Sequence, residues 1–270
     1  MKISVIQLNS QTDKHKNIND ALLIASEAIK SDSPDLIAFP EMLSFCGGTE
    51  EEKKESAESI PLGHTTQALS DFANKNNVYL HGGSFFESAG DRIYNTSLAF
   101  DTNGEIIAKY RKIHLFDITT PNGNDYRESD TVLPGSEIVF YNALNLSIGC
   151  SICYDLRFAE LYLELAKRQV DIIMVPAAFT LQTGKDHWST LLRARAIETQ
   201  SYIVAPGQCG EFPDGENGMR QTWGHSMIVD PWGHIVAQVS DGPGWATAKV
   251  DEKYLRHIRS NVPVSSHRVL

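Results

Sequence analysis

Short apolar runs alternate with amphipathic segments along nearly the whole chain. In residues 17–30, Ile18, Leu22, Ala25 and Ile29 fall on one face at helical spacing. The amphipathic segments predict helices at residues 17–30, 65–77, 156–169, 187–200 and 252–261. The short apolar runs predict strands at residues 3–8, 35–42, 78–85, 94–101, 106–115, 146–153, 171–178, 201–208, 224–230, 234–240 and 244–250.

This order of elements predicts an α/β fold in which helices cover sheets. The Asn-Gly turn at residues 101–105 and the Pro-Trp-Gly turn at residues 231–233 each predict a hairpin. Residues 48–59 are highly charged and predict a solvated helix or a lid. No stretch rich in Pro, Gly or Ser divides the chain, so residues 1–270 are expected to form one domain. The tail at about 261–270 lacks periodicity, and we expect it either to pack on a neighbouring subunit or to be loose.

Composition and charge narrow the classes of partner. The chain has 270 residues and a formal net charge of −10. Nucleic acid and anionic membranes select for basic surfaces, so neither is expected as the main partner. The longest apolar run, residues 172–179, is too short to span a bilayer. With four cysteines and no recognisable secretory signal, we expect free thiols and a cytoplasmic location.

Three polar residues lie at the ends of predicted strands, where α/β proteins collect their ligand sites. They are Glu41, Lys112 and Cys153. A carboxylate can accept a thiol proton, and an ammonium can stabilise an oxyanion. Each residue alone has an ordinary explanation: a solvated turn, a surface lysine and a packed cysteine. Spacing alone does not show that the three side chains meet.

The segments around these residues resemble the nitrilase superfamily of carbon–nitrogen hydrolases. They are AFPEM with Glu41, YRKIHLF with Lys112, and CYDLRFAELY with Cys153, and flanking segments extend the resemblance from Ile3 to about Arg268. The resemblance implies a four-layer α-β-β-α sandwich, with two β-sheets flanked by helices. It also implies a homodimer or higher homo-oligomer, in which the sandwich extends across the subunit interface.

The resemblance further implies a set of catalytic roles. Glu41 is the general base, Lys112 stabilises the oxyanion, and Cys153 is the nucleophile. Glu128, in YRESDTVLPG, is expected to orient Lys112 or the substrate amide, although a plain turn carboxylate is the alternative. The backbone N–H of Tyr154 is a second oxyanion donor. The predicted reaction hydrolyses a small linear amide to an acid and ammonia through a thioester, with no metal and no organic cofactor.

The segments after the nucleophile resemble the branch of deaminated-glutathione amidases and omega-amidases, whose substrates are α-keto-acid amides. Thr180 favours the deaminated-glutathione side, whereas Ala159 and the long loop at residues 210–222 depart from the pattern. The loop from Phe179 to Trp188 either forms a wall of the substrate pocket or only caps a helix near His187 through Thr180 and Thr183. The candidate substrate-binding residues are Tyr154, Phe179, Thr180 and Arg157, and Arg193 and Arg195 are further candidate carboxylate anchors. A structural or interface role is the favoured alternative for each of the three arginines, and His114 is expected to be a packing or hydrogen-bonding residue.

Three other interpretations are open. The enzyme could be an N-carbamoyl amidohydrolase or a nitrilase. The C-x-x-C spacing of Cys150 and Cys153 could mark a redox pair or half of a metal site, although no second C-x-x-C or Cys/His cluster completes a zinc site. The chain could also be an inactive scaffold, which the intact Glu41, Lys112 and Cys153 argue against. Because Cys150 lies three residues before Cys153 on a strand, we expect the two thiols to face opposite sides.

Overall fold

The N-terminal half of the chain and a late strand form one large sheet. The computed structural model describes residues 1–119, 125–215 and 218–269. This first sheet has eight strands in the order β18-β1-β2-β3-β5-β4, with β6 and β9 also paired to β5. Its strands are β1 (Lys2–Gln7), β2 (Leu36–Ala38), β3 (Tyr79–His81), β4 (Phe85–Ala89), β5 (Arg92–Phe100), β6 (Ile106–Arg111), β9 (Val132–Leu133) and β18 (Gly244–Lys249).

The second sheet has six strands in the order β10-β11-β12-β13-β16-β17. They are β10 (Phe140–Ala143), β11 (Leu146–Cys150), β12 (Ile172–Met174), β13 (Tyr202–Ala205), β16 (Met227–Val229) and β17 (Ile235–Gln238). Two small antiparallel pairs lie apart from both sheets. These are β7 (Asp117–Thr119) with β8 (Asp125–Arg127), and β14 (Cys209–Pro213) with β15 (Met219–Trp223).

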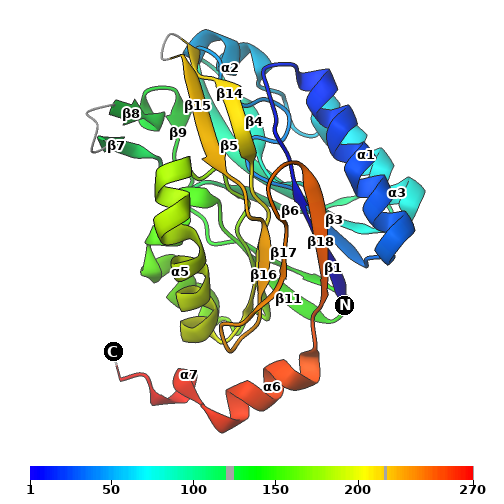
Figure 1. Cartoon of the computed structure of the whole chain (residues 1–270), viewed down its shortest axis with the longest axis vertical. Coiled ribbons are helices and arrows are strands. Elements are labelled where there is room, and N and C mark those ends of the chain that lie inside the picture. Colours follow the sequence, from blue (N-terminus) through cyan, green and yellow to red (C-terminus); the bar gives the residue numbers. More distant parts are fainter. Residues whose placement is uncertain (120–124, 216–217, 270) are drawn as a thin grey trace.

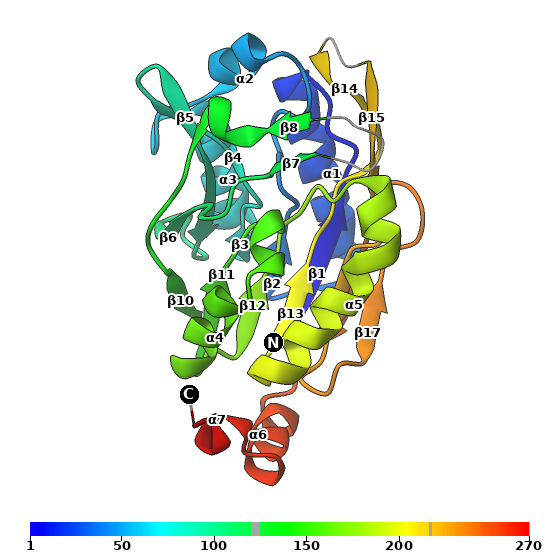
Figure 2. The same cartoon turned by 90° about the vertical axis from the view of Figure 1, so that its left-hand side faces the viewer.

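The side-chain alternation of β1 explains how four layers form. Ile3 and Val5 point into the core between the two sheets, whereas Ile6 and Leu8 point the other way. The second face packs against α1 (Lys14–Asp32) and α3 (His64–Asn76). On the second sheet the covering helices are α4 (Ala159–Lys167) and α5 (Leu181–Thr199). Figure 1 shows α1 and α3 on one side of the sheets and α5 on the other, and Figure 2 shows α4 and α5 over the second sheet. The predicted α-β-β-α sandwich is confirmed.

Several predicted elements have different bounds in the structure. The run at 78–85 is two strands, β3 and β4, because the chain turns at Gly83, which has a left-handed φ of 61°. The helix expected to start near His187 begins at Leu181, directly after Thr180. The helix expected from residue 156 begins at Ala159, after a 3₁₀ turn at Cys153–Arg157.

The charged segment and the C-terminal tail both contain helices. Residues 48–59 contain α2 (Glu50–Ser56), which has Thr49 as its N-cap. The chain ends in α6 (Glu252–Asn261) and α7 (Val264–His267), which lie below the sandwich in Figure 1. Gln200 Nε2 donates to the carbonyl of Val262, and Arg268 to that of Glu198, so the tail touches the end of its own α5. Within the described chain, no helix is both long and apolar enough to cross a membrane.

Candidate active site

The carboxyl ends of parallel strands meet at one place in this fold. In the first sheet, β1, β2 and β3 run parallel, and Glu41 follows β2. In the second sheet, β11, β12 and β13 run parallel, and Cys153 follows β11. Lys112 directly follows β6. The two sheets thus present a carboxylate, an ammonium and a thiol to one cavity, which is the arrangement expected of an α/β ligand site.

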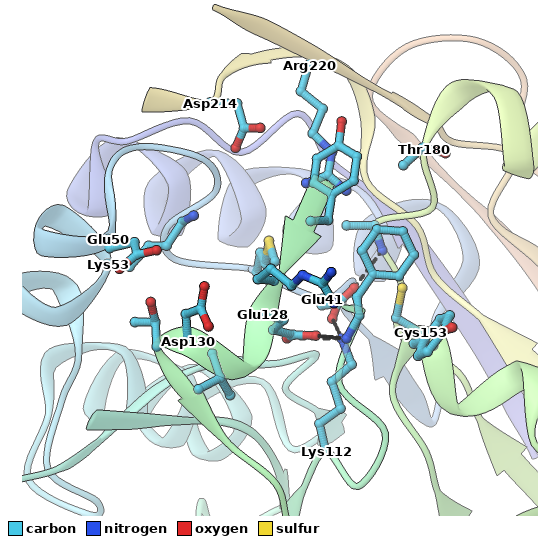
Figure 3. A pocket seen from close by; sticks show the side chains of 18 of the residues that line it. Glu41, Glu50, Lys53, Lys112, Glu128, Asp130, Cys153, Thr180, Asp214 and Arg220 are labelled. Carbon is cyan, nitrogen blue, oxygen red and sulfur yellow. Dashed lines mark hydrogen bonds and ion pairs between the residues drawn. The ribbon is translucent and has the colours of Figure 1, made fainter. Parts of the chain in front are cut away.

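A buried ammonium between two carboxylates forms the floor of this cavity. Lys112 Nζ lies 3.0 Å from Glu41 Oε1, and 2.8 Å and 3.1 Å from the two carboxylate oxygens of Glu128. Only 2% of the Lys112 side chain and 1% of the Glu41 side chain are exposed. Figure 3 shows the two glutamates converging on the Lys112 ammonium, with Cys153 beside it. The structure therefore brings together Glu41, Lys112, Glu128 and Cys153, four residues that lie far apart in the sequence.

Electrostatics keeps Lys112 charged in this buried position. Burial lowers the pKa of Lys112, but the charges of Glu128 and Glu41 outweigh burial and hold this pKa well above its ordinary value. Glu128 is itself held by the backbone N–H of Phe116, at 2.6 Å. The ammonium therefore stays protonated and is fixed in place before any substrate arrives.

Cys153 has an unusual backbone conformation. Its φ of 46° is left-handed, which few residues other than glycine adopt, and its N–H donates to the carbonyl of Pro176 at 2.9 Å. Such conformations cluster at functional sites because the surrounding structure must hold them. Cys153 is the first residue of the 3₁₀ turn Cys153–Arg157. The N–H of Tyr154 therefore lies in the first turn of a helix and has no acceptor within that helix.

The Cys153 thiol is neutral in the resting site. Burial raises its pKa well above the ordinary value, and the Glu41 carboxylate raises this pKa further, while Lys112 opposes both effects. A neutral thiol next to a carboxylate can give up its proton as it attacks, so that no free thiolate is stored. Cys150 differs from Cys153, because it is not among the residues that line the cavity; it is packed in the core, where burial raises its pKa to about 12.

Three groups that position Glu41 escaped the sequence analysis. Asn95 Nδ2 donates to Glu41 Oε1 at 2.9 Å, and the backbone N–H of Ala178 donates to Oε2 at 2.9 Å. Gln208 Nε2 donates to the backbone carbonyl of Glu41, also at 2.9 Å. A signal existed for Asn95, since Asn95, Thr96 and Ser97 form a polar run inside a strand pattern that is otherwise apolar. Ala178 contributes only a backbone group and carries no signal.

The predicted substrate-binding residues all line the cavity, whose volume is about 470 Å³. They are Tyr154, Phe179, Thr180 and Arg157. The Arg157 guanidinium lies 5.4 Å from the ring centre of Phe179 and 3.3 Å from His187 Nδ1. Thr180 also caps α5, because its hydroxyl accepts a hydrogen bond from the backbone N–H of Thr183. The two alternatives for this loop, a pocket wall and a helix cap, therefore both hold for Thr180.

Two further arginines and one histidine lie in structural contacts. Arg193 Nε donates to the carbonyl of Gly233, and Arg195 donates to the carbonyl of Leu156 and pairs with Glu198. Neither is among the residues that line the cavity, so the proposal that they anchor a substrate carboxylate is not supported. His114 Nδ1 lies 2.7 Å from Asp155 and its ring stacks on Phe158, as expected of a packing residue.

The cavity has a charged outer wall that sequence reasoning did not find. Lys53 of α2, Arg220 of β15 and Arg127 line it, together with the acidic residues Glu50, Asp125, Asp130 and Asp214. The segments of Lys53, Arg127 and Arg220 were singled out in the sequence, but only the fold shows that these three side chains line one cavity. In residues 1–119, 125–215 and 218–269, no group of three or more His, Cys, Asp or Glu side chains could hold a metal ion.

Comparison with known proteins identifies the class of enzyme. The model of the carbon–nitrogen hydrolase family matches residues 2–260. The chain is 39% identical to a deaminated glutathione amidase of Synechocystis, over 98% of this chain and 97% of that protein. It is 34% identical to an omega-amidase of Danio rerio, over 99% and 94% of the two chains. The chain therefore belongs to the carbon–nitrogen hydrolase family, and it is a hydrolase of carbon–nitrogen bonds other than peptide bonds.

A solved structure supports the same assignment. The C. elegans NitFhit protein superimposes with a TM-score of 0.91 at 36% identity. The match covers 99% of this chain and 65% of the NitFhit chain.

Proposed function

We propose that this chain is a cysteine-dependent amidase whose preferred substrate is deaminated glutathione or a closely related α-keto-acid amide. One observation carries the proposal: the Lys112 ammonium lies between the Glu41 and Glu128 carboxylates, beside the Cys153 thiol, in a cavity whose wall carries both cationic and acidic residues. The similarity to amidases with that name supports the choice of substrate. Residues 1–270 are proposed to act as one catalytic domain, since both sheets contribute to the cavity.

The proposed mechanism uses Glu41, Lys112, Cys153 and the backbone N–H of Tyr154. Glu41 accepts the thiol proton as Cys153 sulfur attacks the amide carbonyl carbon. Lys112 and the N–H of Tyr154 stabilise the oxyanion that forms. When the C–N bond breaks, Glu41 gives its proton to the leaving amine, and a thioester remains. Glu41 then deprotonates a water molecule, which hydrolyses the thioester to the acid.

The leaving group depends on the substrate. A primary amide such as α-ketoglutaramate releases ammonia. Deaminated glutathione releases the dipeptide cysteinylglycine, because its cleaved amide nitrogen belongs to cysteine. Both substrates give the same keto acid, α-ketoglutarate. Release of α-ketoglutarate therefore measures both reactions on one scale, whereas ammonia alone would miss the larger substrate.

Steady-state kinetics with the two substrates side by side tests the choice between them. We expect kcat/KM for deaminated glutathione to exceed that for α-ketoglutaramate by more than about tenfold, which is about 1.4 kcal/mol of transition-state binding. The opposite preference would support the second candidate, an omega-amidase, which the similarity to the Danio rerio protein favours. Hydrolysis of N-carbamoyl amino acids or nitriles alone would contradict both.

Substitution of each cysteine tests the catalytic assignment. Cys153→Ala should abolish keto-acid release, because no other thiol lines the cavity within the described residues. Cys150→Ser is the matched control, since Cys150 lies in the core; it should keep the activity and lower only stability. Circular dichroism would check that both variants are folded. Full activity in Cys153→Ala would refute the mechanism, and loss of activity in a stably folded Cys150→Ser would restore the paired-thiol interpretation.

We also propose that the protein acts as a homodimer in the cytoplasm. Ile197 of α5 and Trp232 of the β16–β17 turn are each 50% exposed, and the Arg193–Gly233 hydrogen bond holds α5 against this turn. Apolar side chains exposed on adjoining elements are typical of an interface. All four cysteines are free, as a reducing compartment allows. Light scattering should give the mass of a dimer for the native chain and a smaller mass for Trp232→Glu.

A further inference from the structure

The outer wall of the cavity carries an arginine, Arg220, that forms no salt bridge within the described part of the chain, although Asp214 lines the same cavity. Arg220 is the second residue of β15, and its guanidinium lies 4.2 Å from the ring centre of Tyr126 and 5.7 Å from that of Phe116. Its Nε is buried and has no hydrogen-bond partner within residues 1–119, 125–215 and 218–269. A buried guanidinium N–H without an acceptor is unfavourable. The two terminal nitrogens of Arg220 make no hydrogen bond within the described residues either, and Arg220 lines the cavity, so these nitrogens are the groups that a ligand can reach.

The aromatic rings around Arg220 hold its charge without neutralising it. Cation–π contacts stabilise a guanidinium and leave its in-plane N–H groups free. Phe212 adds a third ring, 6.0 Å from the guanidinium carbon. A planar guanidinium fixed in this way can bind a carboxylate through two parallel hydrogen bonds. Arg157, in contrast, already contacts His187.

The position of Arg220 indicates which part of a substrate it meets. The floor residues Glu41 and Lys112 are almost fully buried, whereas Arg220 is half-buried and follows Met219, which is 62% exposed. Figure 3 shows Arg220 well away from Lys112, on the same side as Asp214. The acyl part of the substrate stays bonded to Cys153 after the first step, while the leaving amine must depart toward solvent. Arg220 therefore lies on the path of the leaving group.

We propose that Arg220 binds the carboxylate at the far end of the leaving group and so selects amides whose amine product is an anionic peptide. This inference rests on the proposed function, since it assigns the leaving-group end of the substrate in that same cavity. It explains why the cavity extends beyond the space around the cleaved bond. α-Ketoglutaramate has no such carboxylate, because its leaving group is ammonia. Deaminated glutathione ends in the carboxylate of its glycine.

The first test compares Arg220→Gln with the native protein on three substrates. For deaminated glutathione, the variant should lose at least about tenfold in kcat/KM, mainly through KM, because a charge-assisted bidentate contact is lost. For α-ketoglutaramate, kcat/KM should be unchanged. For deaminated glutathione with its glycine carboxylate converted to an amide, the native protein should already show the lower value, and Arg220→Gln should lower it no further.

Two controls separate charge from structure. Arg220→Lys keeps the positive charge but not the planar fork, so its kcat/KM for deaminated glutathione should fall between those of the native protein and Arg220→Gln. Arg256→Gln makes the same substitution on α6, where Arg256 pairs with Glu252 outside the cavity, and should leave all three rates unchanged. Equal losses of Arg220→Gln on all three substrates would overturn the inference.

A binding experiment makes the inference independent of turnover. Cys153→Ala protein, titrated calorimetrically, should bind deaminated glutathione at least about tenfold more tightly than its glycine amide, and adding Arg220→Gln should abolish that difference. If the native protein hydrolyses neither α-keto amide but this difference is present, the proposed function fails and the anion site stands. If hydrolysis occurs and the difference is absent, the function stands and the assignment of Arg220 is wrong.

Discussion

Glu128 shows how one side chain sets the chemistry of another. Its carboxylate touches Lys112 Nζ through both oxygens and accepts the N–H of Phe116, so it fixes both the position and the charge of the ammonium. The sequence around Glu128 is typical of a solvent-exposed turn. Only the fold places the Glu128 carboxylate against a buried lysine. We infer that Glu128 acts through Lys112 and is a positioning residue.

Replacing Glu128 with glutamine should therefore change the pH dependence of the reaction. The Glu128 charge raises the pKa of Lys112, so Glu128→Gln lowers this pKa, and the ammonium loses its proton at a lower pH. The alkaline limb of the kcat/KM profile should move to lower pH, and kcat near pH 7 should fall by about tenfold or more through weaker oxyanion stabilisation. Glu105→Gln, at an exposed turn, should leave the profile unchanged. An alkaline limb at its native position in Glu128→Gln would contradict this role.

At the scale of elements, the loop before α5 and the β14–β15 hairpin form one wall of the cavity. Gly184 of α5 lies against Trp223 of β15, where an added Cβ would be 2.2 Å from the Trp223 Cβ atom. The Trp223 N–H donates to the carbonyl of Phe179 just before α5. Glycine at this position therefore lets the helix approach the hairpin that carries Arg220.

Gly184→Ala should separate these two elements. Alanine favours a helix over glycine by about 1 kcal/mol, so without crowding the change would stabilise the protein. Because the clash involves a Cβ atom that cannot rotate away, we expect a net loss of about 1–3 kcal/mol in the free energy of unfolding, together with a higher KM for deaminated glutathione. Thr190→Ala, at an exposed position of α5, is the matched control and should be neutral or slightly stabilising. Chemical denaturation measures both, and a gain in stability for Gly184→Ala would disprove the crowding.

The same scale shows what the sequence could predict. Apolar runs located β1, β2, β11, β12 and β13, because buried parallel strands are continuously apolar. The break at Gly83 was missed, since its cause is a close approach to Pro40, where an added Cβ would lie 2.0 Å from the carbonyl oxygen. Local motifs singled out Glu41, Lys112 and Cys153, and the structure brings these three residues together at one cavity. Arg220 was missed because its environment of rings comes from distant segments.

At the scale of the whole molecule, a buried histidine lies between the two sheets. His81 of β3 belongs to the first sheet, and its Nδ1 lies 3.3 Å from the hydroxyl of Tyr141 on β10 of the second sheet. Its Nε2 lies 3.0 Å from the Ser97 hydroxyl. The side chain is fully buried, and burial lowers its pKa to about 3. The ring therefore stays neutral in the folded protein under all ordinary conditions.

This neutral histidine should make the packing of the sheets sensitive to acid. Below pH 6.5 the unfolded chain binds a proton at His81 that the folded chain does not bind, so stability falls as the pH decreases from 6.5 toward 3. At pH 4.5 the lowered pKa of His81 corresponds to a loss of about 3 kcal/mol of unfolding free energy, taking 1.36 kcal/mol per pKa unit.

Urea denaturation at pH 7 and pH 4.5 measures this loss of stability. In the His81→Gln variant, the glutamine side chain does not titrate in this range. The variant should therefore lose less stability than the native protein between the two pH values, even if its free energy of unfolding at pH 7 is lower. Carboxylates such as Glu87 titrate in both proteins, so their contributions cancel in the comparison. An equal loss in both would show that His81 does not control the acid response, and the packing of the two sheets would then have to depend on other groups.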